Sequence, residues 1–277
     1  SGPVFRKQED DETRANEFMQ VGFEVFDGSD PAGADADVFV AVQKALDGLP
    51  VRAASGDLGI LMAAVRGLRT TQARKAALFR HIWRPRRFRA LLDRFGGRVA
   101  APATRLALLL ADDPFADAGV QIGKRSRAEV ERRIQTLRAD AEADPISGEE
   151  LALIDALLAV HETLPNVLSA LRDIAVDMPS IAPAVEGLGV RMDALAKRGV
   201  NVEALDFEAS FGRTTLEYYD GFVFGFYANE RPDLPPIATG GRYDALTAQL
   251  GDGRAQPAVG AVIRPDLCVQ LREDMQC

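Results

Sequence analysis

Two stretches of the chain alternate apolar and polar residues with the period of two that a β-strand requires. In residues 17–27, Gln20 and Glu24 lie on the polar face, with Gly22 between them. The apolar face of the same stretch carries Met19, Val21, Phe23 and Val25. Residues 216–228 alternate in the same way. Shorter strands are expected at residues 3–6, 51–54 and 205–211, and a last strand from residue 257 runs into a helix that begins at Pro265.

The remaining apolar positions follow helical spacing. Residues 35–46 predict a helix capped by Asp35, and residues 57–68 predict another. Residues 71–200 show helical patterns only, including capping boxes that begin at Ser126 and Ser147. We therefore predict an α+β chain in which an all-helical insertion, residues 71–200, separates two sheet-containing parts, residues 1–70 and 201–277.

The sequence GGRYD at residues 240–244 suggests a glycine turn that opens a helix. Gly240 and Gly241 allow a sharp bend, and the apolar residues that follow have helical spacing up to Gly251. Such a turn directs free N–H groups at whatever lies before the helix. A plain strand-turn-helix corner explains these residues equally well.

Composition excludes several classes of protein. The 277 residues carry a net charge of −8, which disfavours a surface that binds nucleic acid throughout. Two cysteines are too few for a disulfide framework, and two histidines make a histidine-based metal site improbable. No apolar run is long enough to span a membrane, so a cytoplasmic protein without membrane contact is expected. The chain also opens directly in a strand, which suggests that further residues precede it.

Two groups of charged or polar residues are candidates for binding. Gln20 and Glu24 point the same way, about 13 Å apart along a strand, although an ordinary strand with a polar outer face has the same pattern. Five arginines at positions 80, 84, 86, 87 and 89 surround Trp83. They could bind an anion or an acidic partner, but a solvated helix face is the more common explanation.

Three of these segments resemble motifs of one family. The sequence GGRYD is similar to the glycine-tyrosine motif of histidyl-tRNA synthetases and their relatives. Residues 2–6 with 14–26 resemble motif 2 of the class II aminoacyl-tRNA synthetases in its histidyl version, and residues 214–224 resemble a second histidine-specific motif. The resemblance covers residues 2–68 and 205–271. It implies the class II fold, an antiparallel sheet flanked by helices.

The resemblance also implies roles for individual residues. Arg6 and Arg14 match the arginines that hold ATP in the family. Gln20 and Glu24 match the residues that hold the amino group of histidine. Tyr219 and Tyr243 match the residues that surround the imidazole ring, next to Gly240 and Gly241.

Two departures bear on activity. Thr214 stands where the family has its catalytic arginine, and Leu267 stands where motif 3 has the arginine that clamps ATP. Arg213 or Arg264 could compensate for one loss, but the loss of both positions argues against amino-acid activation, which needs cations to neutralise phosphate.

A histidine pocket without activating chemistry resembles the regulatory subunit of ATP phosphoribosyltransferase. The resemblance implies a non-catalytic protein without cofactor or metal, which activates a short-form catalytic subunit and mediates feedback by L-histidine. A self-dimer within a hetero-oligomer is implied as well. Two alternatives remain: a divergent histidyl-tRNA synthetase, and a synthetase-like module that binds tRNA or another protein. Net charge makes tRNA the less favoured partner.

Overall fold

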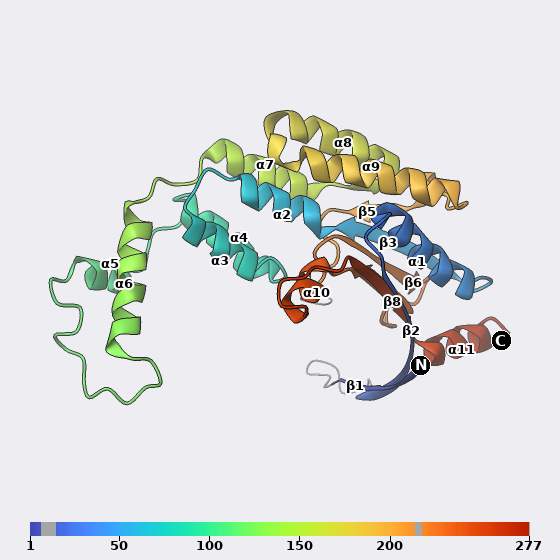
Figure 1. The fold of residues 1–277 in the computed structure, drawn as a ribbon, viewed down its shortest axis with the longest axis horizontal. Helices are drawn as coiled ribbons and strands as arrows, with labels where there is room; N and C mark the ends of the chain where they lie inside the picture. Colours follow the sequence, from blue (N-terminus) through green and yellow to red (C-terminus); the bar gives the residue numbers. More distant parts are fainter. Residues whose placement is uncertain (7–14, 214–217, 277) are drawn as a thin grey trace.

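A single mixed sheet forms the centre of the protein (Figure 1). The computed structural model describes residues 1–6, 15–213 and 218–276. Within them, eight strands follow the order β1-β2-β8-β7-β6-β3-β5-β4, and every neighbouring pair is antiparallel except β3 with β5. The strands are β1 (Gly2–Phe5), β2 (Glu17–Phe26), β3 (Val51–Asp57), β4 (His161–Thr163), β5 (Asp206–Glu208), β6 (Phe222–Ala228), β7 (Ala238–Arg242) and β8 (Ala258–Ile263).

Helices cover one side of this sheet and extend beyond one end of it (Figure 1). Helices α8 and α9 pack together, α9 also contacts α1, and α7 contacts α2. Helices α5 and α6 lie at the far end of the molecule. The helices are α1 (Pro31–Ala45), α2 (Leu58–Gly67), α3 (Gln72–Arg80), α4 (Pro85–Phe95), α5 (Ala103–Leu110), α6 (Arg127–Glu142), α7 (Gly148–Ala159), α8 (Leu164–Asp177), α9 (Ala182–Lys197), α10 (Asp244–Leu250) and α11 (Pro265–Asp274).

The main core lies between the sheet and α1. Phe222, Phe224 and Phe226 alternate along β6 and point to the same face, where each ring lies within 6.3 Å of the ring of Phe39 on α1. The opposite face of β6 carries Val223, Gly225 and Tyr227, and the ring of Tyr227 lies over Gly225, where an added β-carbon would meet it at 3.0 Å.

The predicted insertion contains one element that the sequence pattern did not indicate. Residues 161–163 form strand β4, which pairs with β5 and joins the sheet, so the block is not all-helical. Both predicted capping boxes are confirmed, with Ser126 and Glu129 at the start of α6 and Ser147 and Glu150 at the start of α7. The boundaries of a separate insertion at residues 71–200 stay a prediction.

The first predicted helix begins earlier than expected. Helix α1 starts at Pro31, and the carboxylate of Asp30 accepts a hydrogen bond from the backbone N–H of Gly33. Asp35, which was expected to be the cap, is inside the helix and 1% exposed. Proline at the first helical position favours the earlier start, because its fixed φ suits a helix and its missing N–H needs no partner there.

The apolar face of β2 is exposed, contrary to the usual inward orientation of such a face. Met19, Val21 and Phe23 are all exposed, as is Phe5 on the neighbouring β1. Among the residues that the structure describes, strand β1 pairs only with β2 and ends the sheet on this side. No helix in the described ranges is both long enough and apolar enough to cross a membrane.

Candidate ligand-binding site

A row of small residues crosses the open face of the sheet. Glu24 on β2 pairs with Gly260 on β8, which pairs with Gly241 on β7. Gly241 pairs with Val223 on β6, and Val223 pairs with Gly56 on β3. Residues paired in this way lie on one face of a sheet. The row therefore forms a floor that begins at the exposed Glu24 and continues through residues that are all buried.

The glycines of this floor leave space that larger side chains fill. A β-carbon added at Gly260 would lie 1.5 Å from an oxygen of Glu24. A β-carbon at Gly241 would lie 2.8 Å from the ring of Tyr219. Glu24 and Tyr219 thus lie directly over the strands because those two positions have no side chain.

This arrangement corrects the prediction of a glycine turn. Gly240 and Gly241 are both inside strand β7, and the helix begins only at Asp244. Gly240 faces the core, where an added β-carbon would lie 2.4 Å from the ring of Phe224. The pair serves close packing on both faces of one strand.

Aromatic residues form a wall beside Glu24. The hydroxyl of Tyr243 donates a hydrogen bond to the Glu24 carboxylate. The ring of Tyr218 lies 4.7 Å from the ring of Tyr219 and 5.8 Å from that of Tyr243. Phe26 meets Tyr243 edge-on at 6.5 Å. The structure therefore brings together Glu24, Tyr219 and Tyr243 as expected.

The two predicted tyrosines keep their protons. Burial raises the pKa of Tyr219, and the neighbouring Tyr218 raises it further. Burial also raises the pKa of Tyr243, together with its hydrogen bond to Glu24. Both hydroxyls are thus neutral near pH 7, where Tyr243 acts as a donor to the carboxylate.

The N-terminus of α10 is already occupied by a side chain. The carboxylate of Asp220 accepts hydrogen bonds from the backbone N–H of Asp244 at 3.0 Å and of Ala245 at 2.6 Å. The free N–H groups expected before this helix are therefore used internally. Burial raises the pKa of Asp220, while these two hydrogen bonds oppose the rise.

A buried ion-pair network fixes the floor to the helices. Arg242 on β7 contacts Asp35 at 2.6 Å, and Asp35 also accepts a hydrogen bond from Arg191 on α9 at 2.8 Å. Arg191 reaches Asp57 at 2.7 Å, and Asp57 caps α2 through the N–H of Gly59. The network thus links β7 in the sheet to α1, α2 and α9 in the helix layer through buried side chains.

Several predicted residues lie apart from this cluster. Gln20 is on the same face of β2, but its side chain forms no hydrogen bond with any described residue. Arg6 is exposed after β1, near enough to Tyr218 to lower its pKa, although burial is the larger effect and raises it. Arg14 and Thr214 lie outside the described residues. Leu267 on α11 packs against the main core.

The two arginines considered as substitutes have different surroundings. Arg213 is buried, its Nε donates to the carbonyl of Ile82 at 2.8 Å, and its guanidinium lies over the ring of Phe88. It is thus held against α3 and α4. Arg264 lies over Phe18, which shares the face of β2 that carries Glu24. Of these two arginines, only Arg264 lies on the face of β2 that carries Glu24.

The sequence pattern missed three residues at the site. Residues 218–221 precede β6 instead of extending it, so Tyr218 joins Tyr219 and does not point to the opposite face. Trp83 donates from its indole nitrogen to the carbonyl of Tyr219 at 3.2 Å. Asp220 was not singled out either. The turn-like sequence Asp220-Gly221 could have marked the end of a strand, but no local signal places Trp83 here.

Comparison with known proteins gives the family. A family model described as histidyl-tRNA synthetase matches residues 1–266. The chain is 30% identical to an ATP phosphoribosyltransferase regulatory subunit of Mesorhizobium japonicum, over 98% of this chain and 76% of the relative. It is 31% identical to one of Agrobacterium fabrum, over 94% and 72%. The chain belongs to the histidyl-tRNA synthetase family, among the ATP phosphoribosyltransferase regulatory subunits.

Solved structures of the family confirm the predicted fold. A regulatory subunit/histidyl-tRNA synthetase from Bacillus halodurans superimposes with a TM-score of 0.62 at 21% identity, over 98% of this chain and 56% of that one. A histidyl-tRNA synthetase from Nostoc sp. gives 0.58 at 15% identity, over 94% and 51%. The chain thus spans about half the length of these two structures. The class II synthetase fold of the family, a sheet flanked by helices, is the fold observed here.

Proposed function

We propose that this chain is a regulatory subunit of ATP phosphoribosyltransferase, which activates a short-form catalytic subunit and mediates feedback by histidine in the first step of histidine biosynthesis. The observation that carries the proposal is the match to curated regulatory subunits along nearly the whole chain. A cytoplasmic location follows from the same proposal.

The site supports a role in binding and not in catalysis. Leu267 packs against the core where motif 3 of the family has an arginine, and Arg213 is held against Ile82 and Phe88. A site that activates an amino acid must neutralise the phosphates of ATP. The Asp220 carboxylate at the start of α10 and the Glu24 carboxylate both add negative charge to this face. The protein is therefore proposed to have no catalytic activity of its own.

The same residues suit an amino acid with an aromatic side chain. Glu24 is a negatively charged acceptor for an ammonium group. Tyr219 and Tyr243 offer ring faces for an imidazole and hydroxyls for its nitrogens. Gly241 and Gly260 keep the floor between these groups low. Together these features support L-histidine as the ligand.

The decisive experiment reconstitutes the complex. The chain is mixed with a short-form ATP phosphoribosyltransferase catalytic subunit from the same organism, and formation of phosphoribosyl-ATP is followed with and without histidine. We expect the rate to rise on mixing and histidine to suppress it. If neither the rate nor the mass of the catalytic subunit changes, the proposal is wrong, and histidine-dependent pyrophosphate exchange into ATP would then test a divergent synthetase.

Linkage offers a second measurement on the same pair. If histidine and the catalytic subunit are coupled, each changes the affinity for the other by the same factor. Histidine binding is therefore measured by calorimetry with the chain alone and with the assembled complex. Equal affinities in both states would contradict feedback through this subunit, because a ligand that binds two states equally shifts neither.

We also propose self-association through β2. Met19, Val21 and Phe23 form an exposed apolar face next to Phe5 at the edge of the sheet. Such a patch is unusual on a protein that stays alone in water. We propose that a second copy of the chain packs against this face within the larger assembly with catalytic subunits.

A further inference from the structure

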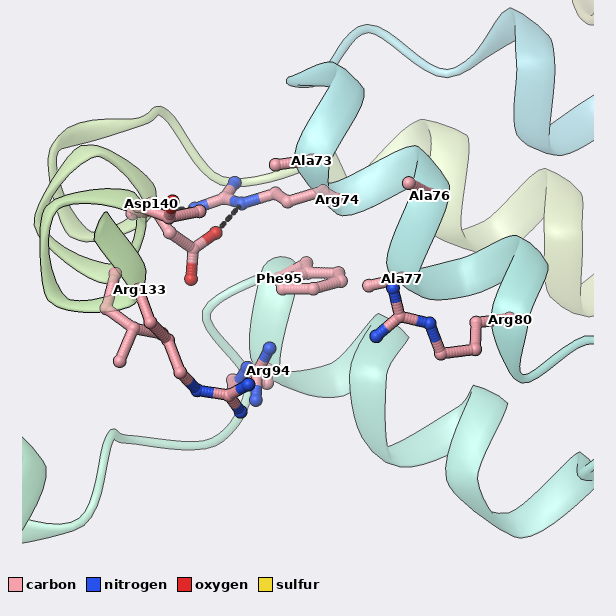
Figure 2. Close-up of a pocket in the computed structure, with 11 residues that line it drawn as sticks. Ala73, Arg74, Ala76, Ala77, Arg80, Arg94, Phe95, Arg133 and Asp140 are labelled. Carbon is pink, nitrogen blue, oxygen red and sulfur yellow. Dashed lines mark hydrogen bonds and ion pairs between the residues drawn. The ribbon is translucent and has the colours of Figure 1, made fainter. Parts of the chain in front are cut away.

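A cavity with a volume of about 340 Å³ lies between α3, α4 and α6 (Figure 2). Its apolar lining comes from Ala73, Ala76 and Ala77 on α3, together with Phe95 and Leu137. The three alanines are spaced so that they share one face of the helix. Their small size keeps the cavity open, since a longer side chain at any of them would fill it.

Four arginines line this cavity against one carboxylate. Arg74 is fully used: its guanidinium contacts Asp140 at 2.6 Å and donates to the backbone carbonyls of residues 140, 143 and 144. Asp140 is shared with Arg105, which approaches it at 3.2 Å. The single acid of the lining is therefore already neutralised.

The other three arginines, Arg80, Arg94 and Arg133, form no salt bridge with any residue that the structure describes. They come from three different helices and surround one hollow (Figure 2). The Nε of Arg94 is buried without a hydrogen-bond acceptor. Burial lowers the pKa of Arg94, and the nearby charges of Arg105 and Arg74 lower it further, while the charge of Asp140 opposes this. The cavity thus concentrates positive charge in a chain whose net charge is −8.

We propose that this cavity binds a small phosphorylated molecule, whose phosphoryl group is held by Arg80, Arg94 and Arg133. Guanidinium groups match the geometry of phosphate oxygens and keep their charge when partly buried. A phosphoryl group carries nearly two negative charges, which suits three unpaired cations better than a single carboxylate does. The volume exceeds that of a bare phosphate, and the alanine face provides an apolar wall for the rest of the molecule.

The site is separate from the synthetase-like pocket. It involves α3, α4 and α6, whereas Glu24, Tyr219 and Tyr243 lie over the sheet. Occupancy here does not require histidine or the catalytic subunit, so the proposal stands or falls independently of the proposed function. A phosphorylated effector bound at this point would contact helices that the histidine pocket does not use.

Calorimetry with the whole chain tests the proposal. The probes are pyrophosphate and ribose 5-phosphate, with ribose and sulfate as comparisons, at low salt and at about 0.15 M salt, where exposed charges are strongly screened. We expect saturable binding of a phosphorylated probe at one site that persists at the higher salt, and none of ribose. Equal weak binding of every anion, sulfate included, that disappears at the higher salt would overturn the proposal.

Matched variants locate the binding. Arg94→Gln and Arg133→Gln should each weaken the phosphorylated probe by about tenfold or more, the loss of a charge-assisted hydrogen bond. Arg132→Gln removes the same charge from the same helix outside the cavity lining, and should change the affinity less than about twofold. Ala76→Leu keeps every charge but fills the space, and should also abolish binding. If Arg132→Gln weakens binding as much as Arg133→Gln, or if Ala76→Leu has no effect, the cavity is not the site.

Discussion

The hydroxyl of Tyr243 donates a hydrogen bond to the carboxylate of Glu24, from a residue 219 positions away in the chain. Tyr243 precedes α10, and Glu24 lies on β2, so the contact closes one end of the glycine floor. The carboxylate retains further lone pairs after accepting this bond. They can hold the ammonium group of an amino acid.

Glu24→Gln should weaken histidine binding without unfolding the protein. The amide still accepts from Tyr243 but loses the charge that attracts an ammonium group. We expect the dissociation constant for histidine to rise by about tenfold or more, measured by calorimetry. Glu17→Gln is the control, because it removes the same charge from an exposed position on the same strand. Equal effects of both variants would show that histidine affinity depends on the overall charge of the protein and not on a contact with Glu24.

Two glycine substitutions should separate binding from stability. In Gly260→Ala the new methyl group meets the flexible end of Glu24, so the carboxylate moves and histidine affinity falls while the melting temperature changes little. In Gly240→Ala it meets the ring of Phe224 and the backbone oxygen of Gly260, which cannot move aside. This variant should lose about 1–3 kcal/mol of stability in urea unfolding. The reverse order of effects would contradict the assignment of the two faces.

Asp35→Ala should be strongly destabilising. It leaves Arg191 and Arg242 buried without their shared carboxylate, which typically costs about 3–5 kcal/mol. Asp37→Ala is the matched control on the same helix, because Asp37 pairs with Arg198 at the surface and should cost less than about 1 kcal/mol. Denaturant unfolding of both variants checks the difference. Similar losses would mean that the buried network contributes little.

Asp220 should give the protein a specific pH dependence. Burial raises the folded pKa of Asp220 above its ordinary value of 3.8, so the folded state holds this proton more tightly than the unfolded state. Its contribution to stability therefore increases as the pH falls from neutrality toward 3.8, and decreases as the pH rises. Asp220→Asn lacks this titration. Unfolding free energies of the two proteins across that range should diverge in favour of the wild type as the pH falls, and parallel curves would refute the shift.

The exposed face of β2 predicts an oligomer that one charge can disrupt. Phe23→Glu should lower the mass measured by light scattering, because a carboxylate cannot be buried in an apolar interface without a partner. Gln20→Glu, which places the same carboxylate on the opposite face of the strand, should leave the mass unchanged. The proposal that this surface is an interface would be wrong if the wild-type chain stays monomeric at all concentrations, both alone and in complex.

The sequence predicted the parts of the fold that depend on local patterns. Period-two alternation identified β2, and the capping boxes at Ser126 and Ser147 set the starts of α6 and α7 within a residue. Strand β4 was missed because three residues, His161–Thr163, cannot show an alternation. The pairing of β4 with β5 depends on contacts between distant segments, which no local window contains.

In the candidate site, too, residues that belong to motifs were predicted, and residues placed by contacts between distant segments were missed. Glu24, Tyr219 and Tyr243 were identified through motifs, and the structure brings them together. The place of Gly240 and Gly241 was wrong because a glycine pair before a helix suits a turn as well as a strand, and only the neighbouring Tyr219 and Phe224 decide between them. Trp83 reaches the site from the helical block through one hydrogen bond to a backbone carbonyl, a contact without any sequence signature.

The position of Asp35 has a consequence for the motions of the protein. Its carboxylate is shared by Arg242 on β7 and Arg191 on α9, so neither element can open without breaking a contact of the other. Amide hydrogens in the middle of these two elements should therefore exchange with solvent at similar rates, through one common opening event. An allosteric change that starts at the floor of the pocket would then reach the helix layer as a concerted fluctuation and not as a local one.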